Sequence, residues 1–207
     1  IAKVAVRGSG VKGLKWYEDG KLLQKENTFS DFIEATRGLR QKYNLKPKQV
    51  FARGVSAGGI VMGVMANRYP EDFGGLILDR PFLDVYGGMS DSTKYLTTIE
   101  YTEWGNPKVE SFGRYIQGYS PYQNINRDFT TNLFFRASQF DEITTTPQIA
   151  KNVFRYRENN TSDTLILFKI REGEGHMVRY NYKDAAEEYA FMMYVLRDQH
   201  DLNKTEN

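Results

Sequence analysis

The chain of 207 residues is 40% hydrophobic and 14% aromatic, which suffices for one domain with a buried core and excludes a disordered chain. Its 28 basic and 26 acidic residues are mixed along the sequence, so the formal charge of +2 predicts neither a nucleic-acid partner nor an anionic membrane partner. There is no cysteine, which excludes a disulfide framework, a thiolate metal site and a cysteine nucleophile. No apolar run reaches the roughly 18 residues of a membrane-spanning helix.

The first predicted elements are a strand, a loop and a helix. Residues 4–6 are apolar and partly β-branched, which predicts a short buried strand, and the glycines among residues 7–13 predict a loop. Thr28, with Asp31 three residues later, predicts the N-cap of an amphipathic helix that ends at residue 43. Because the chain lacks an initiator Met and starts directly on the strand, we expect it to be a carboxyl-terminal part of a longer protein.

Strands and helices continue to alternate along the rest of the chain. Residues 84–130 are rich in Gly, Tyr, Ser, Thr and Asn, which predicts long loops and short helices rather than a separate domain. The order of elements predicts an α/β fold in which a mostly parallel sheet carries helices on both faces, within one domain over 1–207. The other predicted elements are strands at 49–53, 75–79, 133–137 and 165–170, helices at 57–69, 146–156 and 185–198, and a polar, frayed tail from Asp201.

Ser56 lies in Gly54-Val55-Ser56-Ala57-Gly58, a G-x-S-x-G pattern between a predicted strand and a predicted helix. We expect a sharp turn that holds Ser56 in a strained backbone conformation, with Gly54 and Gly58 required because side chains at these positions would not fit. The amide of Ala57 would then donate to an oxyanion at the start of the helix. Taken alone, the pattern is explained equally well by a tight turn of purely structural origin.

A catalytic serine needs a base, and the chain offers two histidines. His176 follows the fifth predicted strand in a Gly-punctuated loop, whereas His200 lies beside the polar tail and is expected to be solvated. Asp141 follows the fourth predicted strand, and the order Ser56, Asp141, His176 is the order of α/β-hydrolases. Each residue alone has a structural explanation, and Glu142 competes with Asp141. Together they predict a Ser-His-Asp triad in which Asp141 orients His176.

Several segments outside the triad resemble those of a known protein family. They are Arg7-Gly8-Ser9-Gly10, Trp16-Tyr17-Glu18-Asp19-Gly20-Lys21, Asn27-Thr28-Phe29, Asp31-Phe32-Ile33, Pro81-Phe82, Asp84-Val85, Glu103-Trp104-Gly105-Asn106-Pro107, Tyr119-Ser120-Pro121-Tyr122 and Gly175-His176. With these segments the sequence resembles the prolyl oligopeptidase family of serine peptidases nearly from end to end, and its oligopeptidase B branch more closely than prolyl oligopeptidase itself.

The resemblance implies an α/β-hydrolase peptidase domain, preceded by a β-propeller that admits only short, unstructured peptides. The propeller, the first strands of the hydrolase domain and the tyrosine that completes the family's oxyanion hole are expected outside these 207 residues. Short peptides are therefore the implied substrates. No metal or organic cofactor is implied, and the resemblance points to a cytoplasmic location.

Substrate specificity is implied by the segment 97–104. Oligopeptidase B cleaves after Arg or Lys with a pair of glutamates, and Glu100 matches the first of them. Thr102 stands in place of the second, so Glu103 is the candidate substitute. A solvated loop carboxylate is an equally good explanation of Glu100.

Three other positions depart from the family pattern. Ile143 replaces an arginine that holds the substrate backbone, residues 177–179 replace a Gly-rich stretch, and Val11 replaces a glutamate.

These observations leave three hypotheses for the function. The first is a peptidase that cleaves short peptides after basic residues. The second is an esterase or thioesterase on the same triad, because loss of the arginine penalises peptides most. The third is a catalytically weak binding module, or a truncated product that does not fold alone.

Overall fold

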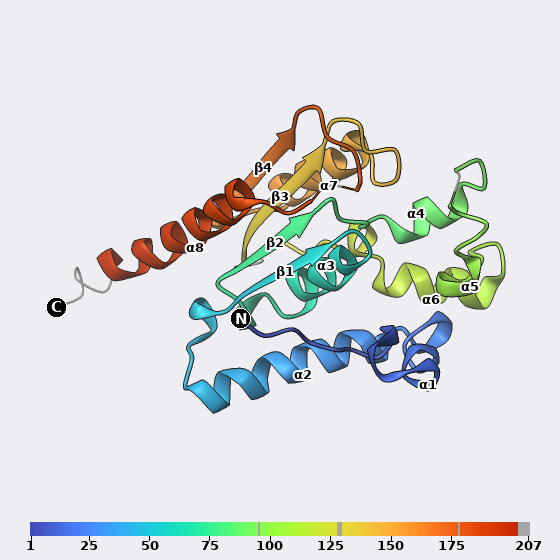
Figure 1. Ribbon diagram of the computed structural model, residues 1–207, viewed down its shortest axis with the longest axis horizontal. Coiled ribbons are helices and arrows are strands. Elements are labelled where there is room, and N and C mark those ends of the chain that lie inside the picture. The colour runs from blue at the N-terminus through green and yellow to red at the C-terminus, as the bar shows by residue number, and fades with distance from the viewer. Residues whose placement is uncertain (95, 128–129, 178, 203–207) are drawn as a thin grey trace.

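A computed structural model describes residues 1–94, 96–127, 130–177 and 179–202. Within these ranges the centre of the molecule is a parallel sheet with the strand order β1-β2-β3-β4 (Figure 1). All strands therefore end at the same edge of the sheet, where loops meet. The strands are β1 (Phe51–Val55), β2 (Gly75–Asp79), β3 (Asn132–Ser138) and β4 (Ile166–Arg171).

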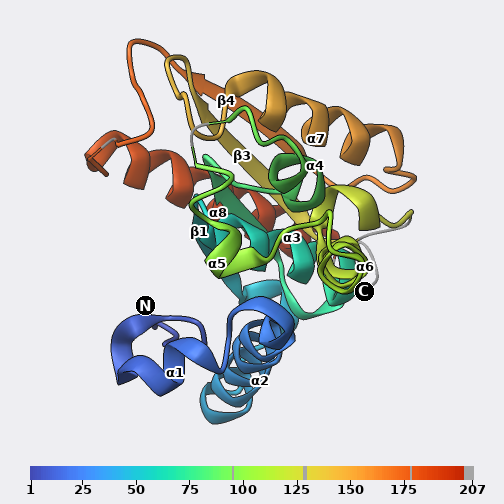
Figure 2. The same cartoon turned by 90° about the vertical axis from the view of Figure 1, so that its right-hand side faces the viewer.

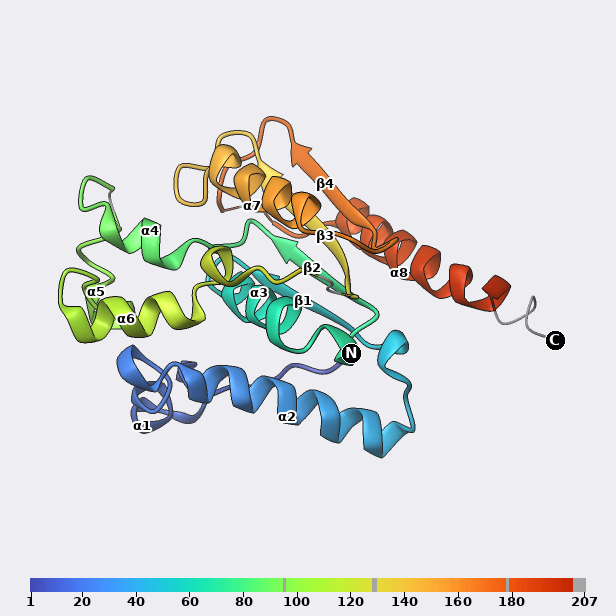
Figure 3. The same ribbon diagram turned by 180° about the vertical axis from the view of Figure 1, so that it is seen from behind.

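Helices cover both faces of the sheet, as predicted. The helices α3 (Gly58–Arg68) and α7 (Thr146–Glu158) lie on one face, and α8 (Tyr182–Leu202) lies on the other, as Figures 1 and 3 show from opposite sides. The helix α2 (Glu26–Tyr43) packs against the outside of α3. The sheet thus forms the middle layer of the molecule.

The core is divided between the two faces because successive residues of a strand point to opposite sides. Leu76 and Leu78 of β2 belong to the larger cluster, which the side chains of α2, α3 and α7 complete. Ile77 lies between them in the chain and belongs to the smaller cluster, where it packs with Phe191 and Val195 of α8. This alternation explains the continuous apolar run of β2, which is buried along its whole length.

The long connection between β2 and β3 carries short helices, as predicted for 84–130. These helices gather beyond the carboxyl ends of the strands (Figure 2). They therefore lie where a binding site is expected in a parallel α/β sheet. They are α4 (Val85–Ser90), α5 (Tyr101–Trp104) and α6 (Glu110–Tyr119), and a further short helix, α1 (Leu14–Glu18), precedes α2.

Two predictions for the amino-terminal region are wrong. Residues 1–6 form no strand among the described residues, since they run along α2 instead of beside β1 (Figure 1). Thr28 is not an N-cap, because α2 begins at Glu26. The Thr28 hydroxyl instead donates to the carbonyl oxygen of Arg7 at 2.7 Å, and the amide of Arg7 donates to Asp31 at 2.8 Å. Thr28 and Asp31 therefore hold the first loop against α2.

A network of buried ion pairs lies between the sheet and α8. Its centre is Arg136 of β3, whose side chain is fully buried. The Arg136 guanidinium donates to Glu188 at 2.9 Å and lies 3.5 Å from Asp79. Burial of these charges is tolerated because each cation has carboxylates around it. We call this group the Arg136 network; its members are Arg53, Asp79, Arg136, Arg171, Asp184 and Glu188.

Candidate active site

Ser56 stands in a sharp turn between β1 and α3. Its φ of +51° lies in the left-handed region, which non-glycine residues seldom adopt. The turn is held from β2 and the loop after it. The Ser56 amide donates to the carbonyl oxygen of Asp79 at 3.0 Å, and the Ser56 carbonyl accepts from the amide of Phe82 at 3.0 Å. The strained turn expected from the sequence is therefore present, and backbone hydrogen bonds stabilise it.

The glycines that the turn requires differ in part from the predicted ones. A Cβ atom on Gly54 would lie 2.2 Å from the carbonyl oxygen of Gly58, so Gly54 is required as predicted. A Cβ atom on Gly58 would meet no described atom within 4 Å, so the prediction for Gly58 is wrong. The second close approach falls one residue later. A Cβ atom on Gly59 would lie 2.4 Å from the Cβ atom of Pro81.

The structure brings Ser56, His176 and Asp141 into one hydrogen-bonded series. The Nε2 atom of His176 lies 3.0 Å from the Ser56 hydroxyl oxygen, and Nδ1 lies 2.8 Å from the Oδ2 atom of Asp141. A carboxylate only accepts hydrogen bonds, so Nδ1 carries the ring proton and Nε2 is free to accept the serine proton. The imidazole remains 13% exposed, whereas the Asp141 side chain is fully buried.

Hydrogen bonds keep the buried Asp141 carboxylate charged. Burial raises its pKa, but the hydrogen bonds from His176 and from the amides of Thr144 and Ile143 outweigh this effect and hold the pKa below the usual aspartate value. The two amides donate to Oδ1 at 2.8 and 2.9 Å, while Oδ2 faces the imidazole. Asp141 is therefore an anion aimed at His176.

The loops that carry Asp141 and His176 are bonded to each other. The amide of Gln139 donates to the carbonyl oxygen of Arg171 at 2.9 Å, and the amide of Phe140 donates to that of Glu174 at 2.8 Å. The side-chain oxygen of Gln139 in turn accepts from the amide of Gly173 at 2.9 Å. These bonds fix the two loops as one unit, which keeps the separation of Asp141 and His176 small.

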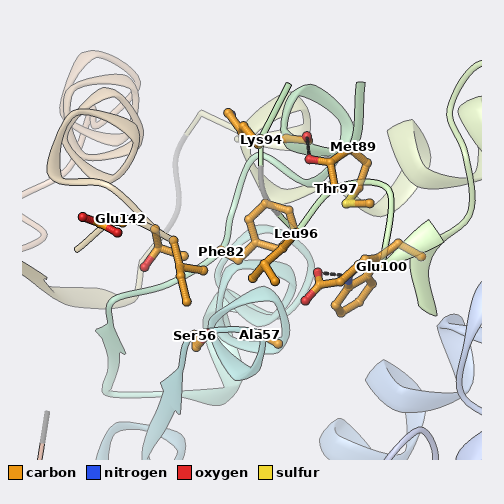
Figure 4. Close-up of a pocket in the computed structure, with 13 residues that line it drawn as sticks. Ser56, Ala57, Phe82, Met89, Lys94, Leu96, Thr97, Glu100 and Glu142 are labelled. Atoms are coloured by element: carbon orange, nitrogen blue, oxygen red, sulfur yellow. Dashed lines mark hydrogen bonds between the residues drawn. The ribbon is translucent and has the colours of Figure 1, made fainter. Parts of the chain in front are cut away.

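A cavity of about 310 Å³ opens beside Ser56 (Figure 4). Ser56 and Ala57 lie at its base, and Ala57 is the N-cap residue of α3, where the amide is favourably placed for an anion. The connection between β2 and β3 supplies most of the cavity wall, and within it the sequence singled out Glu100 but not the apolar residues, because their spacing has no regular period. The apolar part of the wall consists of Phe82, Met89, Leu96 and Trp104.

Glu100 is placed in the wall of the cavity, which Ile143 also lines. Its Oε2 atom accepts a hydrogen bond of 2.8 Å from the indole Nε1 of Trp104, which is only 4% exposed (Figure 4). The indole leaves Oε1 of the carboxylate available. Glu100 is thus an oriented negative charge within a largely apolar cavity.

Glu103 is not brought to the cavity. Its carboxylate accepts from Lys25 at 3.1 Å and from the Tyr17 hydroxyl at 2.6 Å, on the side of α5 that faces the amino-terminal segment. Burial lowers the pKa of Lys25, and the charge of Glu103 opposes this effect. The Glu103 bond raises the pKa of Tyr17 to about 12. The prediction that Glu103 contacts substrate is therefore corrected: it neutralises a buried lysine that lies far away in the sequence.

The neighbours of Asp141 also have defined places. Glu142 is exposed, and its carboxylate lies apart from the other labelled residues of the cavity (Figure 4), so Asp141 rather than Glu142 reaches His176. Ile143 lines the cavity and is 43% exposed. Of residues 177–179, position 178 lies outside the described residues, as do the side chain of His200 and the tail residues 203–207.

Two further findings concern metals and membranes. Within the described part of the chain, no three His, Asp or Glu side chains are grouped so that they could hold a metal ion. No helix in the same ranges combines the length and the apolar composition that crossing a membrane requires.

The sequence is similar to that of known proteins over most of its length. A profile described as the prolyl oligopeptidase family matches residues 1–199. The sequence is 38% identical over 192 residues to "Protease 2" of Moraxella lacunata, a match that covers 91% of this chain and 28% of that protein. The chain thus spans well under a third of the length of this relative.

Solved structures agree with the sequence match. Oligopeptidase B from Leishmania major superposes with a TM-score of 0.87 at 35% identity, covering 93% of this chain and 27% of that one. Oligopeptidase B from Trypanosoma brucei with covalently bound antipain, in its closed form, gives a TM-score of 0.87 at 36% identity, covering 93% and 28%. The chain therefore has an α/β-hydrolase fold and belongs to the prolyl oligopeptidase family.

Proposed function

We propose that this chain carries the active site of a serine peptidase that hydrolyses short peptides after basic residues. The observation that carries the proposal is the series Asp141–His176–Ser56, with separations of 2.8 and 3.0 Å, at the base of a cavity. The names of the relatives, which include a protease and oligopeptidases, support the same reaction class.

The proposed reaction proceeds in two steps. His176 Nε2 takes the hydroxyl proton while Ser56 Oγ attacks the scissile carbonyl carbon, and the Ala57 amide donates to the developing oxyanion. Asp141 stabilises the imidazolium, which then protonates the leaving amine and leaves an acyl group on Ser56. Water attacks this acyl-enzyme with His176 again as the base, and the second product leaves. The relative solved with covalently bound antipain supports a covalent step.

The preference for basic residues is proposed from Glu100. A lysine or arginine side chain combines an apolar stem with a terminal cation, and the cavity offers apolar side chains beside the oriented carboxylate of Glu100. The restriction to short peptides and the cytoplasmic location rest on the family resemblance. We propose that a β-propeller elsewhere in the protein supplies this restriction.

Labelling with a fluorophosphonate probe tests the proposed function. The protein expressed from its complete gene is expected to react with the probe once per chain, and to cleave a short peptide after Arg. Cleavage that is lost in proportion to labelling shows that both belong to the same active site. A folded protein that neither labels nor cleaves would instead favour the binding-module hypothesis.

An esterase or thioesterase is the second candidate, and Ile143 favours it. An isoleucine at this position in the cavity wall provides no donor for a peptide carbonyl. A peptide depends more on such contacts than an activated ester does. Amide and ester substrates with the same acyl group distinguish the candidates, since a peptidase cleaves the amide as well as the more reactive ester, whereas an esterase cleaves only the ester efficiently.

Glu100→Gln is expected to lower kcat/KM for an arginine substrate by about 10²-fold, because a guanidinium placed in the cavity loses its charge partner. The glutamine oxygen can still accept the Trp104 hydrogen bond, so the wall keeps its shape. Cleavage of a matched norleucine substrate is expected to change by less than about threefold. Glu103→Gln is the control, and selectivity should persist in it. An equal loss for both substrates in Glu100→Gln would contradict the assignment.

A further inference from the structure

We propose that Thr144 is a positioning residue, whose side-chain hydroxyl fixes the Asp141 carboxylate against His176. The inference rests on the proposed function, since it assigns a task within the same triad. Thr144 follows Asp141 by three residues, is 3% exposed and lies in the wall of the cavity. Neither the G-x-S-x-G pattern nor the resemblance assigns it any role.

The hydroxyl of Thr144 lies where three parts of the chain meet. It is 3.0 Å from Oδ2 of Asp141 in its own loop and 3.3 Å from Nδ1 of His176 in the loop after β4. It is also 3.0 Å from the carbonyl oxygen of Arg80, just after β2. Arg80 has a φ of +47° and lies between Asp79 and Phe82, whose backbone groups hold the Ser56 turn. One hydroxyl therefore touches the segments that carry the acid, the base and the support of the nucleophile.

The Thr144 hydroxyl is a hydrogen-bond donor to the Asp141 carboxylate. Oδ1 of Asp141 accepts two amides, from Ile143 and Thr144. Oδ2 accepts the imidazole N–H, and the Thr144 hydroxyl is the remaining donor beside it. The hydroxyl has one hydrogen, which the Asp141 carboxylate and the Arg80 carbonyl share. When this hydrogen points to Oδ2, all four acceptor positions of the buried carboxylate are filled, and its plane cannot rotate away from His176 without losing a bond.

Charged groups around Asp141 give no substitute for that donor. His176 approaches from the loop after β4 and is already bonded to Oδ2. Arg80 approaches from the end of β2 and is buried. However, its guanidinium lies 3.6 Å from the carboxylate of Asp79, and among the described residues it makes no hydrogen bond to Asp141. Glu142 is exposed, and its carboxylate has no hydrogen to donate. Among the described residues the carboxylate therefore depends on the Thr144 hydroxyl for its fourth bond.

The alternative is that the hydroxyl only stabilises the loop. Thr146 offers a matched control for this possibility. Thr146 is the first residue of α7, and its hydroxyl donates to the backbone carbonyl of Ser138 at 3.0 Å, the same length as the bond from Thr144 to Asp141. Replacement of either threonine by valine removes one hydroxyl and keeps the shape of the side chain.

Steady-state cleavage of a short arginine peptide by the complete protein tests the inference. Thr144→Val is expected to lower kcat about 10- to 100-fold, the effect of losing a hydrogen bond to a charged group, with KM changed less than about twofold. Thr144→Ser restores the hydroxyl and is expected to restore kcat to within about threefold of the unaltered protein. Thr146→Val is expected to lower the melting temperature but to leave kcat unchanged.

Two outcomes would overturn the inference while leaving the proposed function intact. One is an unaltered kcat in Thr144→Val. The other is an equal loss in Thr144→Ser and Thr144→Val, which would assign the effect to the methyl group. If the unaltered protein neither cleaves the peptide nor reacts with the fluorophosphonate probe, the proposed function fails and the inference fails with it.

Discussion

Ser56→Ala is expected to lower kcat/KM for a short arginine peptide by at least about 10⁴-fold and to abolish fluorophosphonate labelling. The alanine leaves the left-handed turn intact, because the bonds that hold it come from the backbone of residue 56. Only the nucleophile is lost. His176→Ala is expected to cause a loss of similar size, because the hydroxyl then has no base at 3.0 Å.

The two variants combined provide the sharper measurement. The losses of activity caused by residues that act as one unit are not additive. The activity of the double variant should therefore lie within about threefold of that of the less active single variant. Ser111→Ala, an exposed position on α6, serves as the control and should behave like the unaltered protein. Labelling that persists in Ser56→Ala would show that another residue reacts with the probe, and would refute the assignment of the nucleophile.

Asp141→Asn is expected to lower kcat by about 10⁴-fold while KM changes little. The asparagine amide can present a donor to Nδ1, so the imidazole would place its proton on Nε2 and could no longer accept the proton of Ser56. The size of the side chain is unchanged, and a melting curve would show whether the fold is retained.

The neighbouring carboxylate makes this prediction specific. Glu142→Gln removes the same charge one residue later, where the side chain is exposed, whereas it is Asp141 that is bonded to the imidazole. We expect it to retain nearly full activity. Strong loss in Glu142→Gln together with an active Asp141→Asn would reverse the assignment of the acid.

The interior of the fold could be predicted from sequence because its signals are local. The apolar run 75–79 is β2 without any shift, since a strand buried on both faces needs apolar residues throughout. At the other strands, ends moved by one or two residues. β1 begins at Phe51 rather than at residue 49 because Pro47–Gln49 form a short helical turn. Residues 4–6 have strand composition, but composition does not supply the neighbouring strand that pairing requires.

In the candidate site, too, residues with a local sequence signal could be predicted and contacts between distant segments could not. Ser56, Asp141 and His176 could be singled out because chain order and position after strands are visible in the sequence. Contacts between distant segments are not visible. The pairing of Glu103 with Lys25 spans 78 residues, and its cause is the burial of a lysine that the sequence presents as an ordinary surface residue. Thr144 had one weak signal, a hydroxyl shortly after the acid. Its bond to Arg80 depends entirely on the tertiary fold.

The Arg136 network has a consequence for how this sequence can change over evolutionary time. Loss of one member leaves an uncompensated charge in the interior, which costs about 3–5 kcal/mol, whereas exchange of the whole set for apolar side chains of similar volume costs little. Substitutions at Asp79, Arg136 and Glu188 are therefore strongly coupled. We therefore expect these positions to change together among related sequences, so that the residue at one of them predicts the residues at the others.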